Sequence, residues 1–143
     1  MEKKDFRIGN ICNIQVFGIG DEPVAGIENA ILVAEDFVKY KAFEGIPITE
    51  ARLLKLGFEK TVSELYDEDG RPTGEFETHE GHFHHKKLEF MMDYYLPYNC
   101  FNQCPCFSFT ENKQKYCHYV TVEYVHQLQN LYFALTGEEL NVK

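Results

Sequence analysis

Two clusters of potential metal ligands lie close together in the sequence. The segment "THEGHFHHKK" (residues 78–87) holds four histidines within seven residues, and "CFNQCPCF" (residues 100–107) holds three cysteines within seven. Histidine nitrogen and cysteine sulfur are common zinc ligands, and a structural zinc site needs four ligands arranged as a tetrahedron. Zinc binding is therefore one candidate chemistry for this region.

Such a site requires two neighbouring strands. Residues two positions apart in a strand project to the same face, so His82 and His84 would share a face, as would Cys104 and Cys106. Two such strands side by side would form a Cys2His2 site. The possible substitutes among the nearby ligands are His79, Cys100, Cys117 and His118.

The spacing of these residues weighs against a metal. The sequence has no C-x2-C knuckle, and its intervals match none of the usual zinc-finger patterns. Cysteine also serves as a small buried hydrophobic residue, and a histidine on a solvated strand needs no ligand. We therefore predict a protein without a cofactor and keep zinc as the alternative.

No catalytic motif is recognisable either. The sequence lacks a glycine-rich phosphate loop, a G-x-S-x-G elbow and an H-E-x-x-H helix. Cys117 and His118 are adjacent in "YCHY", but adjacent residues of a strand point to opposite faces. We predict that the protein is not an enzyme.

The charge of the chain restricts its partners. Its 143 residues carry a formal charge of −9, from 23 acidic and 14 basic residues. An acidic surface repels phosphate backbones, which disfavours direct nucleic-acid binding. Seven carboxylates and one arginine lie between Glu64 and Glu80. This run predicts a solvated hairpin, and its alternative interpretation is an acidic surface for a basic partner.

The sequence predicts a cytoplasmic protein that does not enter a membrane. It has no apolar run near the ~20 residues that cross a bilayer, and no apolar segment follows the charged start "MEKKDFRIGN" to form a signal peptide. The five cysteines, an odd number, are accordingly predicted to remain thiols in a reducing compartment.

The elements that must position these residues predict an α+β fold. Residues 1–46 contain short alternating runs such as "FRIGNICNIQVFG", typical of a small SH3-like or curled β-sheet region. The segment "IENAILVAEDFVKY" fits both a strand and a helix. Residues 47–143 form the α+β region, either a separate domain or one continuous with the first.

In the second region, Thr49 is predicted to cap a short helix that ends near Gly57. A strand, the turn "DEDGRPTGE", two strands broken at Gly81 and a hairpin in "CFSFTENKQKYCHYVTV" should form a mainly antiparallel sheet. An amphipathic helix that ends at Gly137 closes the chain.

The C-terminal helix has an apolar core stripe and a second, mixed stripe on a helical wheel. The first stripe is predicted to be buried and consists of Tyr124, Val125, Leu128, Leu131, Tyr132 and Leu135. The second stripe is either covered by another element or an interaction surface for a homodimer or a protein partner. It consists of Val122, His126, Gln129 and Phe133.

Three segments carry a resemblance to a known family. "FRIGN", "IPITEARLLKLGFEK" and "YVHQLQNLYFALTGEEL" resemble segments of a family of small uncharacterised proteins from Bacteroidetes-type bacteria, their prophages and phages. The middle of the chain, residues 67–120, departs from that family. The resemblance implies a fold and a mobile-element setting, and it implies no activity.

Two functions follow as hypotheses. In the first, the chain is a cytoplasmic accessory protein of a phage or mobile element that binds a protein, as an inhibitor or adaptor of a host system. In the second, it is a zinc-stabilised module or enzyme that uses the clusters at residues 79–85 and 100–117.

Overall fold

The computed structural model describes residues 1–88, 92–95, 106–110 and 117–142, with 92–95, 106–110 and 117–120 described by their backbone alone. The chain forms an α+β structure of two compact units. Unit 1 comprises residues 1–48 and 123–141, and unit 2 comprises residues 49–122 and 142–143. The C-terminal helix thus belongs to the same unit as the N-terminal strands.

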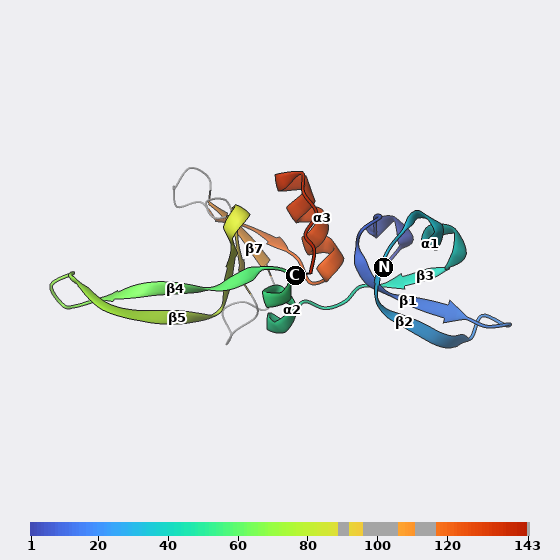
Figure 1. Cartoon of the computed structure of the whole chain (residues 1–143), viewed down its shortest axis with the longest axis horizontal. Helices are drawn as coiled ribbons and strands as arrows, with labels where there is room; N and C mark the ends of the chain where they lie inside the picture. The colour runs from blue at the N-terminus through green and yellow to red at the C-terminus, as the bar shows by residue number, and fades with distance from the viewer. Residues whose placement is uncertain (89–91, 96–105, 111–116, 143) are drawn as a thin grey trace. The chain divides into compact units, whose positions relative to one another are not determined.

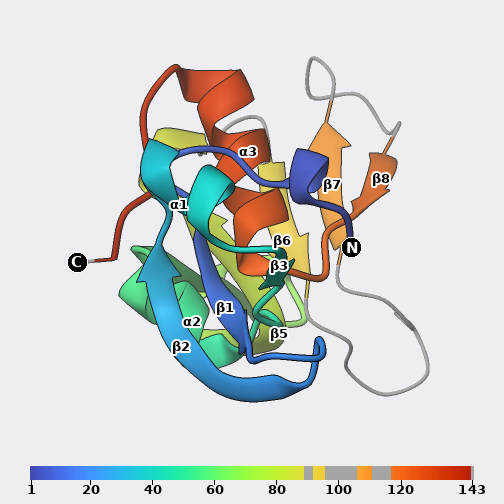
Figure 2. The same ribbon diagram turned by 90° about the vertical axis from the view of Figure 1, so that its right-hand side faces the viewer.

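Unit 1 is built on a three-stranded antiparallel sheet. Strand β1 (Ile11–Phe17) lies between β2 (Pro23–Ile31) and β3 (Ala42–Glu44). The register between β1 and β2 shifts twice, and β2 is visibly curved beside β1 (Figure 2). These three described strands do not close into a barrel. The SH3-like alternative is therefore wrong, and the sheet is open and curled.

Helices complete unit 1. A 3-10 turn, η1 (Lys3–Asp5), precedes the sheet, α1 (Ala34–Lys39) connects β2 to β3, and α3 (Val125–Thr136) contacts β1. The ambiguous segment near residue 30 is thus the end of a strand followed by a helix. The core side chains of this sheet are Phe6, Cys12, Ile14, Leu32 and Phe43.

A buried glutamine joins α3 to both ends of the chain. The Gln129 side chain is fully buried. Its Oε1 accepts a 2.8 Å hydrogen bond from the backbone N–H of Ile11, and its Nε2 donates to the carbonyls of Leu140 (3.0 Å) and Gly9 (3.4 Å). Buried backbone groups need such partners, so Gln129 supplies bonds that no regular element provides here.

Arg7 makes a second connection between the same segments. Its guanidinium forms a bidentate ion pair with Glu139 at 2.6 and 3.0 Å, and donates to the Asn130 side chain at 2.7 Å. It also lies 4.5 Å from the centre of the Phe133 ring, in cation–π geometry. One arginine thus fixes the entry to β1 against both α3 and the segment that follows α3.

The predicted end of α3 is confirmed, and the helix begins at Val125, directly after Tyr124. The helix ends at Thr136, and Gly137 adopts a left-handed conformation (φ 72°), which glycine tolerates without a Cβ penalty. The predicted core stripe is only partly buried: Val125, Leu128 and Tyr132 are buried, while Tyr124, Leu131 and Leu135 are intermediate.

Unit 2 contains one short helix and a five-stranded antiparallel sheet. The helix is α2 (Glu50–Lys55), and the sheet order is β4-β5-β6-β7-β8. The strands are β4 (Phe58–Tyr66), β5 (Pro72–His85), β6 (Met92–Tyr95), β7 (Cys106–Thr110) and β8 (Cys117–Thr121), with η2 (Lys86–Leu88) after β5. The antiparallel pairing and the β7–β8 hairpin expected from the sequence are confirmed.

Local signals also placed α2 correctly. The Thr49 side chain accepts a hydrogen bond from the Arg52 N–H at 3.3 Å, which caps the helix, and Gly57 follows with φ 87°. The break expected at Gly81 is wrong: β5 runs through it as one strand. Gly81 has φ 73° and lies where β5 contains extra residues relative to β4, so it marks a bulge rather than a strand end.

Replacing Gln129 tests the connection at the centre of unit 1. We expect Gln129→Leu to destabilise the protein by roughly 2–4 kcal/mol, because it leaves the Ile11 N–H and the Leu140 carbonyl buried without partners. The measurement is urea unfolding followed by circular dichroism.

Gln15→Leu provides the matched control for this prediction. Gln15 is half-buried, and its side-chain hydrogen bond to Glu44 is long, at 3.4 Å. We expect the control to change stability by less than about 0.5 kcal/mol. Equal unfolding midpoints for the two variants would show that the buried amide of Gln129 contributes no more to stability than the amide of Gln15.

Candidate functional site: the β4–β5 arm

The far part of the β4–β5 hairpin forms a two-stranded arm. We call residues 61–78 the arm; Figure 1 shows it as the paired green ribbon that extends to a turn. Strand β6 pairs with β5 only at His82, Phe83 and His84. Within the described residues, the arm therefore has no third strand, and both of its edges carry unpaired backbone groups.

The turn at the tip is well defined. The Asp67 N–H donates to the Arg71 carbonyl at 2.9 Å, and the Asp67 side chain accepts from the N–H groups of Asp69 (3.0 Å) and Arg71 (2.8 Å). Gly70 adopts φ 75°, a conformation in which glycine is favoured. The turn predicted over residues 67–75 is thus confirmed for 67–71, where an aspartate side chain mimics a backbone turn, whereas 72–75 already belong to β5.

Strand register assigns the arm's side chains to two faces. Val62 pairs with Thr78, Glu64 with Phe76 and Tyr66 with Pro72, and directly paired residues share a face. Val62, Tyr66 and Phe76 therefore lie on one face, which we call the apolar face. Ser63 pairs with Glu77, so Glu77 and Glu75 lie on the opposite face.

The apolar face is exposed. The exposed fractions are 50% for Val62, 64% for Tyr66 and 65% for Phe76. Single exposed apolar residues are normal on a protein surface, but three on the same face of one hairpin form a patch. An isolated two-stranded hairpin is also only marginally stable in water, so a surface that covers this face would stabilise the arm.

Within the part of the chain that the structure describes, most of the arm's carboxylates have no counter-ion. Among the described residues, no cation pairs with the arm's glutamates or with Asp69, although acids elsewhere in the chain have partners such as Arg7 for Glu139 and Lys60 for Glu50. The unpaired acids of the arm are Glu64, Glu68, Asp69, Glu75 and Glu77. The arm thus combines exposed apolar side chains with uncompensated negative charge.

Of the predicted zinc ligands that the structure describes, the two histidines and Cys106 do not lie on adjacent strands. His82 and His84 are on β5 and Cys106 is on β7, with β6 between them: His82 pairs with Tyr95, and Tyr95 pairs with Cys106. Cys104 lies outside the described residues, as does the side chain of Cys106. No group of three potential ligands occurs among the described residues.

The described histidines near the bulge have protein contacts. His79 Nε2 lies 2.6 Å from the Ser63 hydroxyl. His84 Nδ1 lies 3.4 Å from the Thr61 hydroxyl, and its Nε2 lies 3.7 Å from the Glu59 carboxylate. His85 is buried and packs edge-on against Phe58. These contacts join His79, His84 and His85 to residues of β4.

The second stripe of α3 does not form a continuous exposed surface. Val122, His126 and Gln129 are buried, and only Phe133 is exposed, at 41%. Arg7 covers part of the Phe133 ring. A helical wheel places polar residues on a solvated face, and the two buried polar residues contradict that assumption.

His126 is a buried imidazole between two aromatic rings. It stacks on Phe6 at 4.1 Å between ring centres and on Tyr124 at 5.9 Å. Neither ring nitrogen has a hydrogen-bond partner within the described structure. Burial lowers the pKa of His126 to about 4, against a smaller opposing effect of the Asp5 charge.

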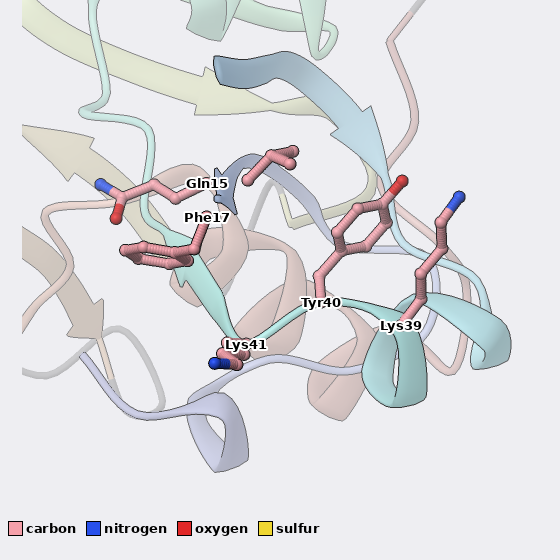
Figure 3. A pocket seen from close by; sticks show the side chains of 6 residues that line it. Gln15, Phe17, Lys39, Tyr40 and Lys41 are labelled. Carbon is pink, nitrogen blue, oxygen red and sulfur yellow. The ribbon is translucent and has the colours of Figure 1, made fainter. Parts of the chain in front are cut away.

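A hollow of about 240 Å³ lies in unit 1, where β1 continues past its pairing with β3 (Figure 3). Its lining residues are Gln15, Val16, Phe17, Lys39, Tyr40 and Lys41. The Lys41 ammonium already pairs with Asp21 at 2.6 Å, and Lys39 lies over the Tyr40 ring at 5.0 Å. Because both cations are engaged, we assign this hollow no ligand.

The cysteine prediction is tested at one position. Cys12 is a free, buried thiol in the core of unit 1, and burial raises its pKa to about 11. A thiol with a raised pKa is a poor nucleophile and a poor metal ligand at neutral pH. The side chains of the other four cysteines lie outside the described residues.

Comparison with known proteins adds no relative: no protein-family model, curated protein or solved structure matches this chain. Among the described residues, no helix has the length and apolarity needed to span a membrane.

Sequence reasoning identified the acidic hairpin but missed its apolar face. The alternating pattern of "TVSELY" and "EFET" contains Val62, Tyr66 and Phe76, and such alternation normally predicts a face buried on a core. The exposed fractions of these side chains in the structure show instead that this face is uncovered.

Protonation of His126 should destabilise unit 1. The folded-state pKa is lowered from 6.5 to about 4, so the unfolded chain binds the proton first as the pH falls. We expect stability from this group to be constant above pH ~6.5 and to fall by at most about 3 kcal/mol between pH 6.5 and 4. Urea unfolding measured across this range checks it.

His126→Leu removes the titrating group and serves as the comparison. Carboxylates also titrate near pH 4, so the informative quantity is the difference in slope between the two proteins. We expect the leucine variant to have the flatter dependence between pH 6.5 and 5. Parallel curves would contradict a neutral, buried His126.

Proposed function

We propose that this chain is an accessory protein of a phage or mobile element that acts by binding another protein through the β4–β5 arm. The mobile-element setting is supported by the resemblance of the three segments around "FRIGN", "IPITEARLLKLGFEK" and "YVHQLQNLYFALTGEEL". The binding role is supported by one observation above all: Val62, Tyr66 and Phe76 are exposed on one face of an arm that no third described strand supports.

The side chains of the arm lie outside the buried core of unit 2, which favours a role in binding rather than in stability. The side chains buried in unit 2 include Leu53, Leu56, Phe58, Phe83 and Leu88, and none of them belongs to the arm. Exposed apolar patches on monomeric proteins mark interaction sites when the residues are contiguous. The arm's apolar residues are thus available to a partner without any unfolding of the unit.

Replacing the apolar face should abolish partner binding. We expect the triple variant Val62→Ser, Tyr66→Ser and Phe76→Ser to retain less than about a tenth of the partner in affinity capture from cells that encode the protein, because central aromatic residues dominate binding energy. The measurement is quantitative mass spectrometry of the captured proteins, followed by binding of the identified protein in purified form.

A second triple variant controls for the loss of exposed apolar side chains in general. It alters three exposed residues of β2 in unit 1, with Val24→Ser, Ile27→Ser and Ile31→Ser. We expect this variant to capture the partner as well as the original protein does. Circular dichroism should show both variants folded. Retention of the partner by the arm variant, or equal loss with the β2 variant, would contradict the proposal.

A further inference from the structure

The arm's charges specify the kind of partner that fits it. Glu75 and Glu77 lie on the face opposite Phe76, and Glu64 lies beside Phe76 on the apolar face. Glu68 and Asp69 lie in the turn at the tip. A partner that covers the apolar face therefore places its own rim within reach of carboxylates on the strands and at the tip.

These carboxylates exclude two classes of occupant. A second copy of the chain would bring two uncompensated acidic arms together, and like charges at an interface oppose association. Nucleic acid would bring phosphates to the same carboxylates, although phosphate neutralisation by cations is what gives such complexes their affinity. Both occupants would leave the arm's charge unpaired and add more negative charge.

From these observations we infer that the partner is a basic protein with an apolar cleft; this inference rests on the proposed function. The arm inserts Val62, Tyr66 and Phe76 into the cleft. Lysines and arginines at the rim of the cleft pair with Glu64, Glu75 and Glu77. Apolar contact supplies affinity, and the charges select the partner and speed its association. Nucleic-acid-binding proteins also use clusters of lysine and arginine to contact nucleic acid. The arm would therefore compete with nucleic acid for the basic surface of its partner.

Two synthetic peptides of equal length and charge test the inference directly. One alternates lysine with leucine, and the other alternates lysine with serine. We expect the purified protein to bind the lysine–leucine peptide at least about tenfold more tightly, because only that peptide can cover the apolar face. Equal affinity for both peptides, or no binding of either, would overturn the inference.

Arm variants separate the two contributions. The double variant with Val62→Ser and Phe76→Ser should bind the lysine–leucine peptide more weakly. The salt dependence of that affinity should stay the same. In Glu75→Gln with Glu77→Gln, the dependence on salt should become weaker, because exposed charge pairs are screened by salt. Identical salt dependence in the charge variant and the original protein would overturn the role of these glutamates.

Two further measurements address the excluded occupants. Sedimentation of the protein alone should show a monomer, and a duplex DNA fragment should not bind; an arm-dependent dimer or DNA complex would overturn the inference. A different result would contradict the proposed function, namely capture of the partner by the triple serine variant of the arm. If the partner captured through the arm is acidic, the proposed function stands and this inference falls.

Discussion

Unit 1 depends on polar bonds that hold the beginning and the end of the chain together. Gln129 satisfies backbone groups of Gly9, Ile11 and Leu140 from inside the fold, and Arg7 bonds to Asn130 and Glu139. A buried amide with all its partners in place specifies one register of α3 on the sheet, because any shift would leave several groups unpaired. The apolar core adds stability, but it does not fix this register so strictly.

This arrangement gives two of the segments that carry the resemblance a structural role in unit 1. Arg7 and Gly9 of "FRIGN" meet Gln129 and Glu139 of the C-terminal segment, so both segments serve the same scaffold. Gly9 has φ 90°, and a Cβ there would lie 3.5 Å from the Glu139 carboxylate, so its conformation favours glycine.

Local signals predicted local structure, and long-range pairing was beyond them. The Thr49 cap, the Asp67–Arg71 turn and the Gly137 helix end were all visible because each depends on a few neighbouring residues. The division between β5 and β6 was misplaced, because Gly81 suggested a strand end there, whereas β5 runs through Gly81 to His85 and β6 begins at Met92. The burial of His126 and Gln129 was missed for a related reason: a helical wheel scores residue type, whereas a polar side chain can be buried once the backbone provides its partners or aromatic rings cover it.

The arm shows why its charge and its apolar face belong together. A two-stranded ribbon with open edges and exposed Val62, Tyr66 and Phe76 is a template for unwanted strand pairing between copies. Carboxylates along both strands and at the tip counter this hazard, because two such arms repel each other. The same charges do not repel a basic surface; they attract it. In the proposed complex, acidity would therefore perform two tasks with one set of residues: it would oppose self-association of the apolar face, and it would favour a partner that neutralises the arm.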